Sequence, residues 1–310
     1  MSTYLIQRLS ALIIVLLGVS IIVFSMLHFI PGDPAAIMAG EAATAEDIAQ
    51  LRKNLSLDKP LYVQYWTFIS NASMGNLGDS LRTYRKVSDE LAVRFPRTLT
   101  LALASLLVAV SIGLPSGIIS ATRQYSAFDY SSMLISILGV SMPTFWSGLL
   151  AMYIFSVKLG WFPTAGAETL RHVVLPAVTL GFSAAAIIAR LTRSTMLEVL
   201  RNDYIRTARS KGVAERQVIW KHALKNAMIP TVTIIGLRFG YLLAGAVVTE
   251  TVFAYPGLGL FLVESIRWRD YPVVQACILL IATSFVLVNL IVDLTYGLLD
   301  PRIREKIKGL

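Results

Sequence analysis

The sequence has 310 residues, of which 55% are hydrophobic and only 15% are charged, and its mean hydropathy is +0.64. Soluble domains carry about one quarter charged residues, so this composition excludes an ordinary soluble domain and indicates an integral membrane protein. The net charge of +9 is compatible with nucleic acid, anionic lipid or an acidic protein as partner. A single cysteine, Cys277, excludes an intramolecular disulfide and a cysteine metal cluster. The three histidines lack metal-ligand spacing, so we expect no metal site and no cofactor.

Six segments are long and apolar enough to be membrane-spanning helices, which need about 20 mostly apolar residues. They predict an all-α, polytopic membrane protein and cover residues 9–30, 98–121, 131–157, 173–192, 231–255 and 273–298. The first apolar run is longer than the core of about 7–15 residues that a signal peptide has. We therefore expect residues 1–30 to form an uncleaved N-terminal transmembrane helix.

A long loop, residues 31–97, follows the first span and has the composition of a folded segment. It carries several aromatic residues and two helical stretches, "EDIAQLRKNLSL" and "VSDELAVRF". The loop is too apolar for a disordered linker. We expect a small helical region on the outer face, followed by a core with five transmembrane helices over residues 98–310.

The orientation of the chain follows from the basic residues in its short loops. With the N-terminus inside, the inner segments hold fifteen Lys and Arg residues and the short outer loops hold four. The loop 31–97 is left out of the count because loops longer than about 60 residues carry little weight. Both termini are expected to face the cytoplasm.

Glycine and proline interrupt three of the predicted spans. They are Gly113, Pro115 and Gly117 in the second, Gly139 and Pro143 in the third, and Pro176 and Gly181 in the fourth. Small residues let helix backbones approach closely, and a proline inside a helix kinks it. Tight packing and bending during a transport cycle both remain open.

Known motifs for catalysis or nucleotide binding are absent from the sequence. It contains no G-x-x-x-x-G-K-[ST] phosphate loop, no G-x-G-x-x-G and no G-x-S-x-G elbow, so we expect no catalytic residue. Nor is there a clear internal repeat of the kind found in ion-coupled carriers. If the protein moves a solute uphill, the energy therefore comes from a partner.

Few charged residues lie within the predicted spans; the fifth holds Arg238 and Glu250, and the sixth holds Asp293. A charge at the centre of a membrane helix costs roughly 2.5–3.5 kcal/mol on insertion scales, so such residues face the bundle interior or a wet path. Arg238 and Glu250 are candidates for a translocation path. A helix-end contact or an interhelical pair is the alternative.

A basic, helix-forming stretch, residues 194–229, separates the fourth and fifth spans; we call it the basic loop. Apolar spacing predicts one helix over 194–211 and a second over 214–229, with Gly212 ending the first. Pro230 would then open the fifth span, because proline is tolerated in a first turn. The residues alone leave three partners open: anionic lipid, a groove on another protein, and nucleic acid.

Motifs spread over nearly the whole chain resemble those of the inner-membrane permeases of ABC importers, in the dipeptide, oligopeptide and nickel branch. They are "HFIPGDPAAIMAG", "LDKPLYVQYW", "MLEVLRNDYIRTARSKG", "AYPGLG", "RDYPVVQA" and "VDLTYGLLDPRIR". Each motif is weak alone, and their common order makes the resemblance specific. All of them look like motifs of the B-type dipeptide permease.

The resemblance implies that the basic loop is the "EAA" loop, which inserts a short coupling helix into a cleft of the ATPase subunit. The consensus falls on Arg206, Thr207 and Ala208, with its glycine at Gly212. Arg206 replaces the consensus Glu and Thr207 the first Ala, as is typical of the peptide branch. Residues carried over as ATPase-coupling residues are Asp203, Tyr204, Arg206, Thr207, Ala208, Arg209, Lys211 and Gly212.

The resemblance therefore implies a non-catalytic permease subunit with the type I ABC-importer fold in the bacterial inner membrane. Its expected partners are a second homologous permease, two ATPase subunits, an extracytoplasmic binding protein and membrane lipid, with no nucleic acid. The expected cargo is a dipeptide or short peptide. The alternatives are a nickel, glutathione or opine importer and, from other classes, an ion-coupled secondary carrier or a channel.

Overall fold

The structure is a computed structural model that describes residues 2–29, 34–40, 43–54 and 57–299. Regular secondary structure in these residues is helical, apart from one isolated β-bridge between Asp79 and Lys86, so the all-α prediction is confirmed. Two π-helical segments, Met152–Lys158 and Val218–Ala223, follow α7 and α10. The helices are α1 (Ser2–Phe29), α2 (Pro34–Ala39), α3 (Ala45–Asn54), α4 (Leu61–Ser73), α5 (Val87–Thr122), α6 (Ala127–Ser141), α7 (Thr144–Ala151), α8 (Leu170–Leu200), α9 (Asp203–Ser210), α10 (Glu215–Gln217), α11 (Leu224–Val252), α12 (Leu258–Arg267) and α13 (Tyr271–Leu299).

Most of the predicted spans correspond to long helices. Four helical segments among the described residues are long and apolar enough to cross a membrane: Val87–Thr122, Leu170–Leu200, Glu215–Val252 and Tyr271–Val292. Helices α6 and α7, with the π-helical segment that follows α7, are together also long and apolar enough to cross a membrane, although they are bent relative to each other. The first predicted span lies in α1, whose described apolar stretch is Ser10–Met26.

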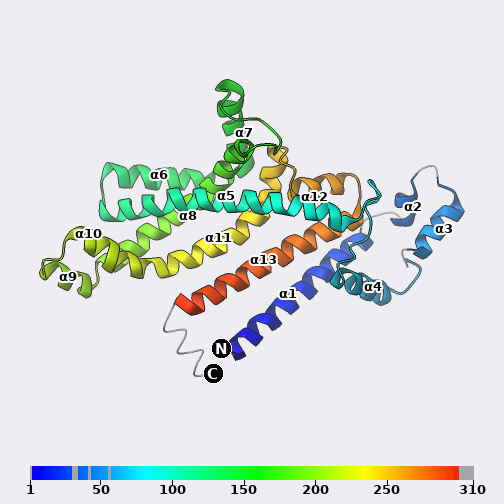
Figure 1. Ribbon diagram of the computed structural model, residues 1–310, viewed down its shortest axis with the longest axis horizontal. Helices are drawn as coiled ribbons and strands as arrows, with labels where there is room; N and C mark the ends of the chain where they lie inside the picture. The colour runs from blue at the N-terminus through cyan, green and yellow to red at the C-terminus, as the bar shows by residue number, and fades with distance from the viewer. Residues whose placement is uncertain (1, 30–33, 41–42, 55–56, 300–310) are drawn as a thin grey trace.

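The third predicted span, residues 131–157, is not one helix. It breaks between α6 and α7, where the chain bends by 108°. Met142 is extended there, with φ −79° and ψ 128°, because the ring of Pro143 disfavours the helical conformation in the residue before it. As a result α7 projects sideways from the bundle (Figure 1).

The basic loop also differs from the prediction at two places. The predicted helix 194–211 is wrong as a single helix, because α8 continues to Leu200 and Asn202 is extended (φ −71°, ψ 149°) before α9 begins. The predicted helix 214–229 is continuous with the fifth span, so Pro230 lies inside a helix of 38 residues, Glu215–Val252. The exposed part of the loop is therefore residues 201–223.

Helices α5 and α8 make the most extensive contact in the molecule and form its centre. Their backbones approach closely where glycine replaces a larger residue. A Cβ atom at Gly117 would lie 2.6 Å from the carbonyl oxygen of Ala189, and one at Gly181 would lie 2.5 Å from that of Ser105. These two glycines of the second and fourth spans therefore serve tight packing.

The molecule is elongated, and its two ends differ (Figure 1). The basic loop, with α9 and α10, lies at one end, and the short helices α2, α3 and α4 lie at the other. The first turns of α1 and the last turns of α13 both lie on the side of the basic loop. Residues 300–310, which hold four of the basic residues in the orientation count, lie outside the described residues.

Candidate functional site

The basic loop turns sharply after α9 at Gly212, which has a φ of +75°. The N–H of Val213 donates to the carbonyl of Ala208 at 3.2 Å, and the N–H of Gly212 donates to that of Arg209 at 3.0 Å. This pair of hydrogen bonds is the Schellman motif, which needs a residue in the left-handed conformation at the position of Gly212. The sequence prediction that Gly212 ends the helix is confirmed.

A small hydrophobic cluster fixes the exposed part of the loop to the helix ends beneath it. Ile205 of α9 and Val218 of the π-helical segment are fully buried, together with Met196 of α8. Ile118 and Ala121, from the end of α5, complete this contact. Because three long helices supply side chains to the cluster, the loop is held as one body with their ends.

Polar contacts hold the two arms of the loop together across Gly212. Arg209 donates two hydrogen bonds to the Glu215 carboxylate, at 2.6 and 3.1 Å. These bonds raise the pKa of Arg209. Asn226 Nδ2 donates to the hydroxyl of Tyr204 at 2.7 Å and ties α9 to α11. Ala214 stands at the N-cap position of α10 and provides no side-chain acceptor.

The predicted coupling residues all lie in α9 and its C-terminal turn. Ala208 is half-buried, and the others are exposed around the buried Ile205: Asp203, Tyr204, Arg206, Thr207, Arg209, Lys211 and Gly212. Asp203 and Arg206 form a loose, fully solvated pair at 3.6 Å. The loop therefore presents a short, polar, mainly basic helix whose apolar side is already covered by the chain itself.

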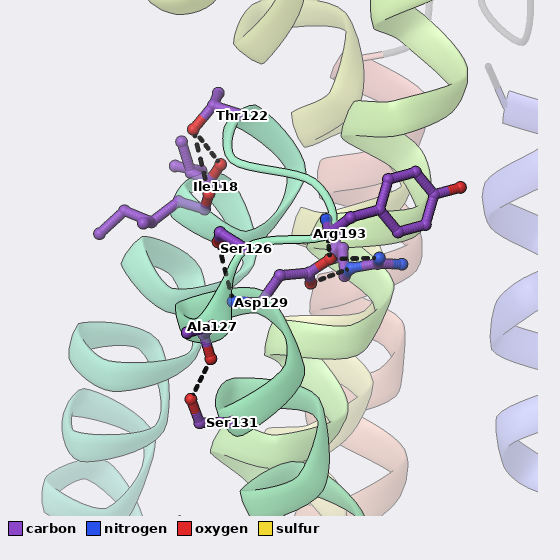
Figure 2. A network of polar contacts seen from close by, with 9 residues as sticks. Ile118, Thr122, Ser126, Ala127, Asp129, Ser131 and Arg193 are labelled. Atoms are coloured by element: carbon purple, nitrogen blue, oxygen red, sulfur yellow. Dashed lines mark hydrogen bonds and ion pairs between the residues drawn. The ribbon is translucent and has the colours of Figure 1, made fainter.

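Sequence reasoning missed an ion pair close to this loop, between Asp129 of α6 and Arg193 of α8 (Figure 2). Arg193 Nε and Nη2 donate to the two carboxylate oxygens at 2.6 and 2.7 Å. Asp129 also accepts from the N–H of Tyr125, and its own N–H donates to Ser126 Oγ. The order Ser-x-x-Asp at residues 126–129 is a helix-start pattern that could have indicated this site. The pair fastens α6 to α8 about two turns before the exposed part of the basic loop, residues 201–223.

Glu250, a candidate for the translocation path, is fully buried near the end of α11. It accepts hydrogen bonds from the hydroxyl of Thr98 at 2.6 Å and from the N–H groups of Gly259 and Leu260 at 2.6 and 3.1 Å. The carboxylate therefore satisfies the free N–H groups at the start of α12. The second glycine of "YPGLG", Gly259, lets the start of α12 approach α11 closely, because a Cβ at Gly259 would collide with the backbone of Val247.

Arg238, the other candidate, lies at the centre of α11, fourteen residues from either end. Its guanidinium lies over the ring of Tyr241, 5.2 Å from the ring centre, and the side chain is half-buried. The side chain of Asp293, in the sixth span, lies outside the described residues. In the described part of the chain, no group of three acidic, histidine or cysteine residues could hold a metal ion.

Comparison with known proteins identifies the family. Residues 113–305 match the family described as "Binding-protein-dependent transport system inner membrane component", and residues 1–102 match its N-terminal companion domain. The chain belongs to this family. The glutathione transport system permease protein GsiC of Escherichia coli strain K12 is 49% identical over 99% of this chain and all of its own length. The GsiC protein of Shigella boydii strain Sb227 is equally similar.

Solved structures of importers have the same fold. The MetNI methionine ABC transporter, in an inward-facing conformation, contains a chain that is 21% identical to this permease, with a TM-score of 0.57 over 68% of this chain and 96% of its own. An amino acid ABC transporter with histidines gives a TM-score of 0.54 at 15% identity, over 69% and 94%. The permease is thus a multi-pass subunit of an ABC importer in the bacterial inner membrane. Separate ATPase subunits hydrolyse the ATP, and a binding protein delivers the cargo.

Proposed function

We propose that this permease is one of two homologous permease subunits that import short peptides, glutathione among them, and that its basic loop docks into a cleft of an ATPase subunit. The observation that carries the docking proposal is the closed, rigid form of the loop. Ile205, Val218 and Ala223 are fully buried in its own cluster, and the large apolar side chains that stay exposed, Tyr204 and Trp220, do not form a continuous apolar face for insertion into lipid. Its outer face is polar and compact, which suits a protein cleft.

The relatives support the choice of cargo. They are glutathione permeases at 49–50% identity over 99% of this chain. Glutathione is itself a short peptide, so this likeness agrees with the dipeptide permease motifs of the sequence. The cargo class is therefore a small, peptide-like molecule with at least one free carboxylate.

The proposed topology puts both termini and the basic loop in the cytoplasm, and residues 31–97 at the outer face. The count of fifteen against four basic residues supports it. The separation of the basic loop from α2, α3 and α4 along the molecule agrees with it (Figure 1). In this arrangement α2, α3, α4 and α12 form the surface that meets the binding protein, and the cargo path runs between the two permeases.

The test is a complex purified with its neighbouring subunits and reconstituted in liposomes with the loaded binding protein. Uptake of radiolabelled glutathione and of dialanine, each with and without ATP, identifies the cargo. Deletion of residues 203–222 is expected to abolish co-purification of the ATPases while the second permease still co-purifies. Equal recovery of the ATPases with the deleted and intact loops would overturn the docking proposal.

A further inference from the structure

Within the described part of the subunit, helix α11 has one face that stays largely uncovered, and the half-buried Arg238 lies on it. The exposed residues Tyr241, Ala244 and Val248 follow Arg238 at intervals of three, three and four residues, which places all four along one side of the helix. Tyr241 is 59% exposed and Val248 is 46% exposed. The side of α11 that carries Gly236 packs on α13, where a Cβ at Gly236 would collide with Val292.

Lipid is a poor neighbour for this face, because Arg238 lies at the centre of α11, well inside the membrane-spanning segment Glu215–Val252. The guanidinium is too far from both helix ends, about 21 Å at 1.5 Å per residue, to reach the lipid headgroups easily. Within the described residues, no carboxylate lies at ion-pair distance from Arg238, and its guanidinium contacts the ring of Tyr241. The charge therefore has a supporting aromatic ring and, in the described part of its own subunit, no counter-ion.

The aromatic neighbour keeps the guanidinium in place and leaves its N–H groups available. Tyr241 is itself held by Phe285 of α13, with the two rings edge to face at 6.0 Å. A guanidinium stacked on a ring keeps its planar fork of donors, which matches the two oxygens of a carboxylate. Arginine that lines a membrane path also favours anions and repels cations.

From this geometry we infer that Arg238, supported by Tyr241, is a carboxylate-binding point halfway along the cargo path. The inference rests on the proposed function, because it places the uncovered face of α11 on that path and assigns the carboxylate to the peptide-like cargo. It adds that the permease itself, and not only the binding protein, recognises an anionic group. Arg238 binds the carboxylate, and Tyr241 is a positioning residue.

A charge-selective labelling experiment tests the site without knowledge of the natural cargo. In the purified complex, Cys277→Ala removes the only cysteine of the permease, and Tyr241→Cys places a new one beside Arg238. The new thiol is treated with an anionic sulfonatoethyl or a cationic trimethylammonium methanethiosulfonate. Both reagents should react, and Arg238→Gln should lower the anionic-to-cationic rate ratio about three- to tenfold, as expected for a unit charge roughly 6 Å away in a wet site.

Val248→Cys, in the same Cys277→Ala background, is the matched control. It is on the same face but ten residues from Arg238, about 15 Å along the axis, which exceeds the Debye length of about 8 Å in physiological salt. Arg238→Gln should leave its rate ratio within twofold. An unreactive thiol in the Tyr241→Cys variant would mean a dry interface with lipid or with the second permease. If the thiol reacts but Arg238→Gln does not change its anionic-to-cationic rate ratio, the guanidinium is engaged elsewhere. Either result overturns the inference.

A competition experiment tests whether Arg238 binds the carboxylate of a peptide. Excess dialanine should slow the anionic labelling of the Tyr241→Cys variant at least twofold when Arg238 is present, whereas dialanine amide should not. Equal effects of the acid and the amide would overturn carboxylate recognition. These results are separable from the proposed function, since ATP-driven uptake can succeed without the anion site. Conversely, the labelling ratio can reveal the site even if the ATPases dock without the basic loop.

Discussion

Gly212 allows the role of the basic loop to be tested with one methyl group. Gly212→Ala adds a Cβ at a position with φ +75°, where no other atom lies within 4 Å of that Cβ. The change therefore creates no clash, and its whole effect is the cost of left-handed geometry for a residue with a side chain, roughly 1–2 kcal/mol. A cost of this size reduces the ratio of formed to unformed turn about 5- to 30-fold.

If the turn presents α9 to the ATPase, the loss of the turn should reduce coupling by a similar factor. Cargo-stimulated ATP hydrolysis and uptake are measured side by side in liposomes that contain the complete complex. We expect Gly212→Ala to lower both rates together, by about 5- to 30-fold at most. Gly212→Asn should lower them less, because asparagine tolerates the left-handed region better than alanine does.

Gly160 provides the matched control. It too has a positive φ, +63°, and a Cβ there would meet no atom within 4 Å, but it lies in the loop after the π-helical segment Met152–Lys158. Gly160→Ala therefore introduces the same kind of backbone strain away from the basic loop. We expect it to leave both rates near those of the unmodified complex. Equal losses for Gly160→Ala and Gly212→Ala would refute the coupling argument, as would full activity of Gly212→Ala.

Three other outcomes can be checked on the same complex. Glu250→Gln replaces a carboxylate that accepts three hydrogen bonds. It should lower the free energy of unfolding by about 1.5–3 kcal/mol, which a lower thermal unfolding midpoint would show. Altered cargo selectivity at unchanged stability would instead support a role for Glu250 in the cargo path. Gly117→Ala should lower the free energy of unfolding by about 1–3 kcal/mol, because the added methyl group overpacks α5 against α8. The same melting assay measures this loss. Gly18→Ala, in open space on α1, should be neutral or slightly stabilising because alanine favours the helix more than glycine does, and equal melting of the two variants would argue against close packing. In the Cys277→Ala background, a cysteine at Ser73 should react with an impermeant reagent from outside and one at Ser210 only after permeabilisation, and the reverse pattern would invert the proposed topology.

Sequence periodicity predicted the long helices well, because apolar length is a strong and local property. It failed where two rules competed. Residues 131–157 are continuously apolar, yet Pro143 breaks them, and the steric effect on Met142 outweighs the apolar pattern. Conversely, Pro230 was expected at a helix start but is accommodated in the interior of Glu215–Val252, where the packing of α11 maintains the helix.

The candidate site was only partly predictable. The turn at Gly212 was predictable, because glycine after an amphipathic helix is a local pattern with one common geometry. The contacts of Glu250 were not predictable, because Thr98 lies 152 residues away in sequence and Gly259 belongs to a different helix. The same holds for the pair of Asp129 and Arg193, separated by 64 residues. Such contacts depend on how helices are arranged in space, which a single sequence does not specify.

The continuous helix from Glu215 to Val252 has a mechanical consequence. Its 38 residues make a rod about 57 Å long, with the basic loop at one end, Arg238 near its middle and Glu250 at the other end. A tilt of about 10° at the loop end displaces the far end by about 10 Å, and the mid-point by roughly half as much. The π-helical segment Val218–Ala223 lies at the base of this rod, where the hydrogen-bond pattern changes while the helix continues. With the basic loop docked on an ATPase subunit, as proposed above, a small rotation of that subunit would move the far end of the helix by leverage, without a chain of separate side-chain rearrangements.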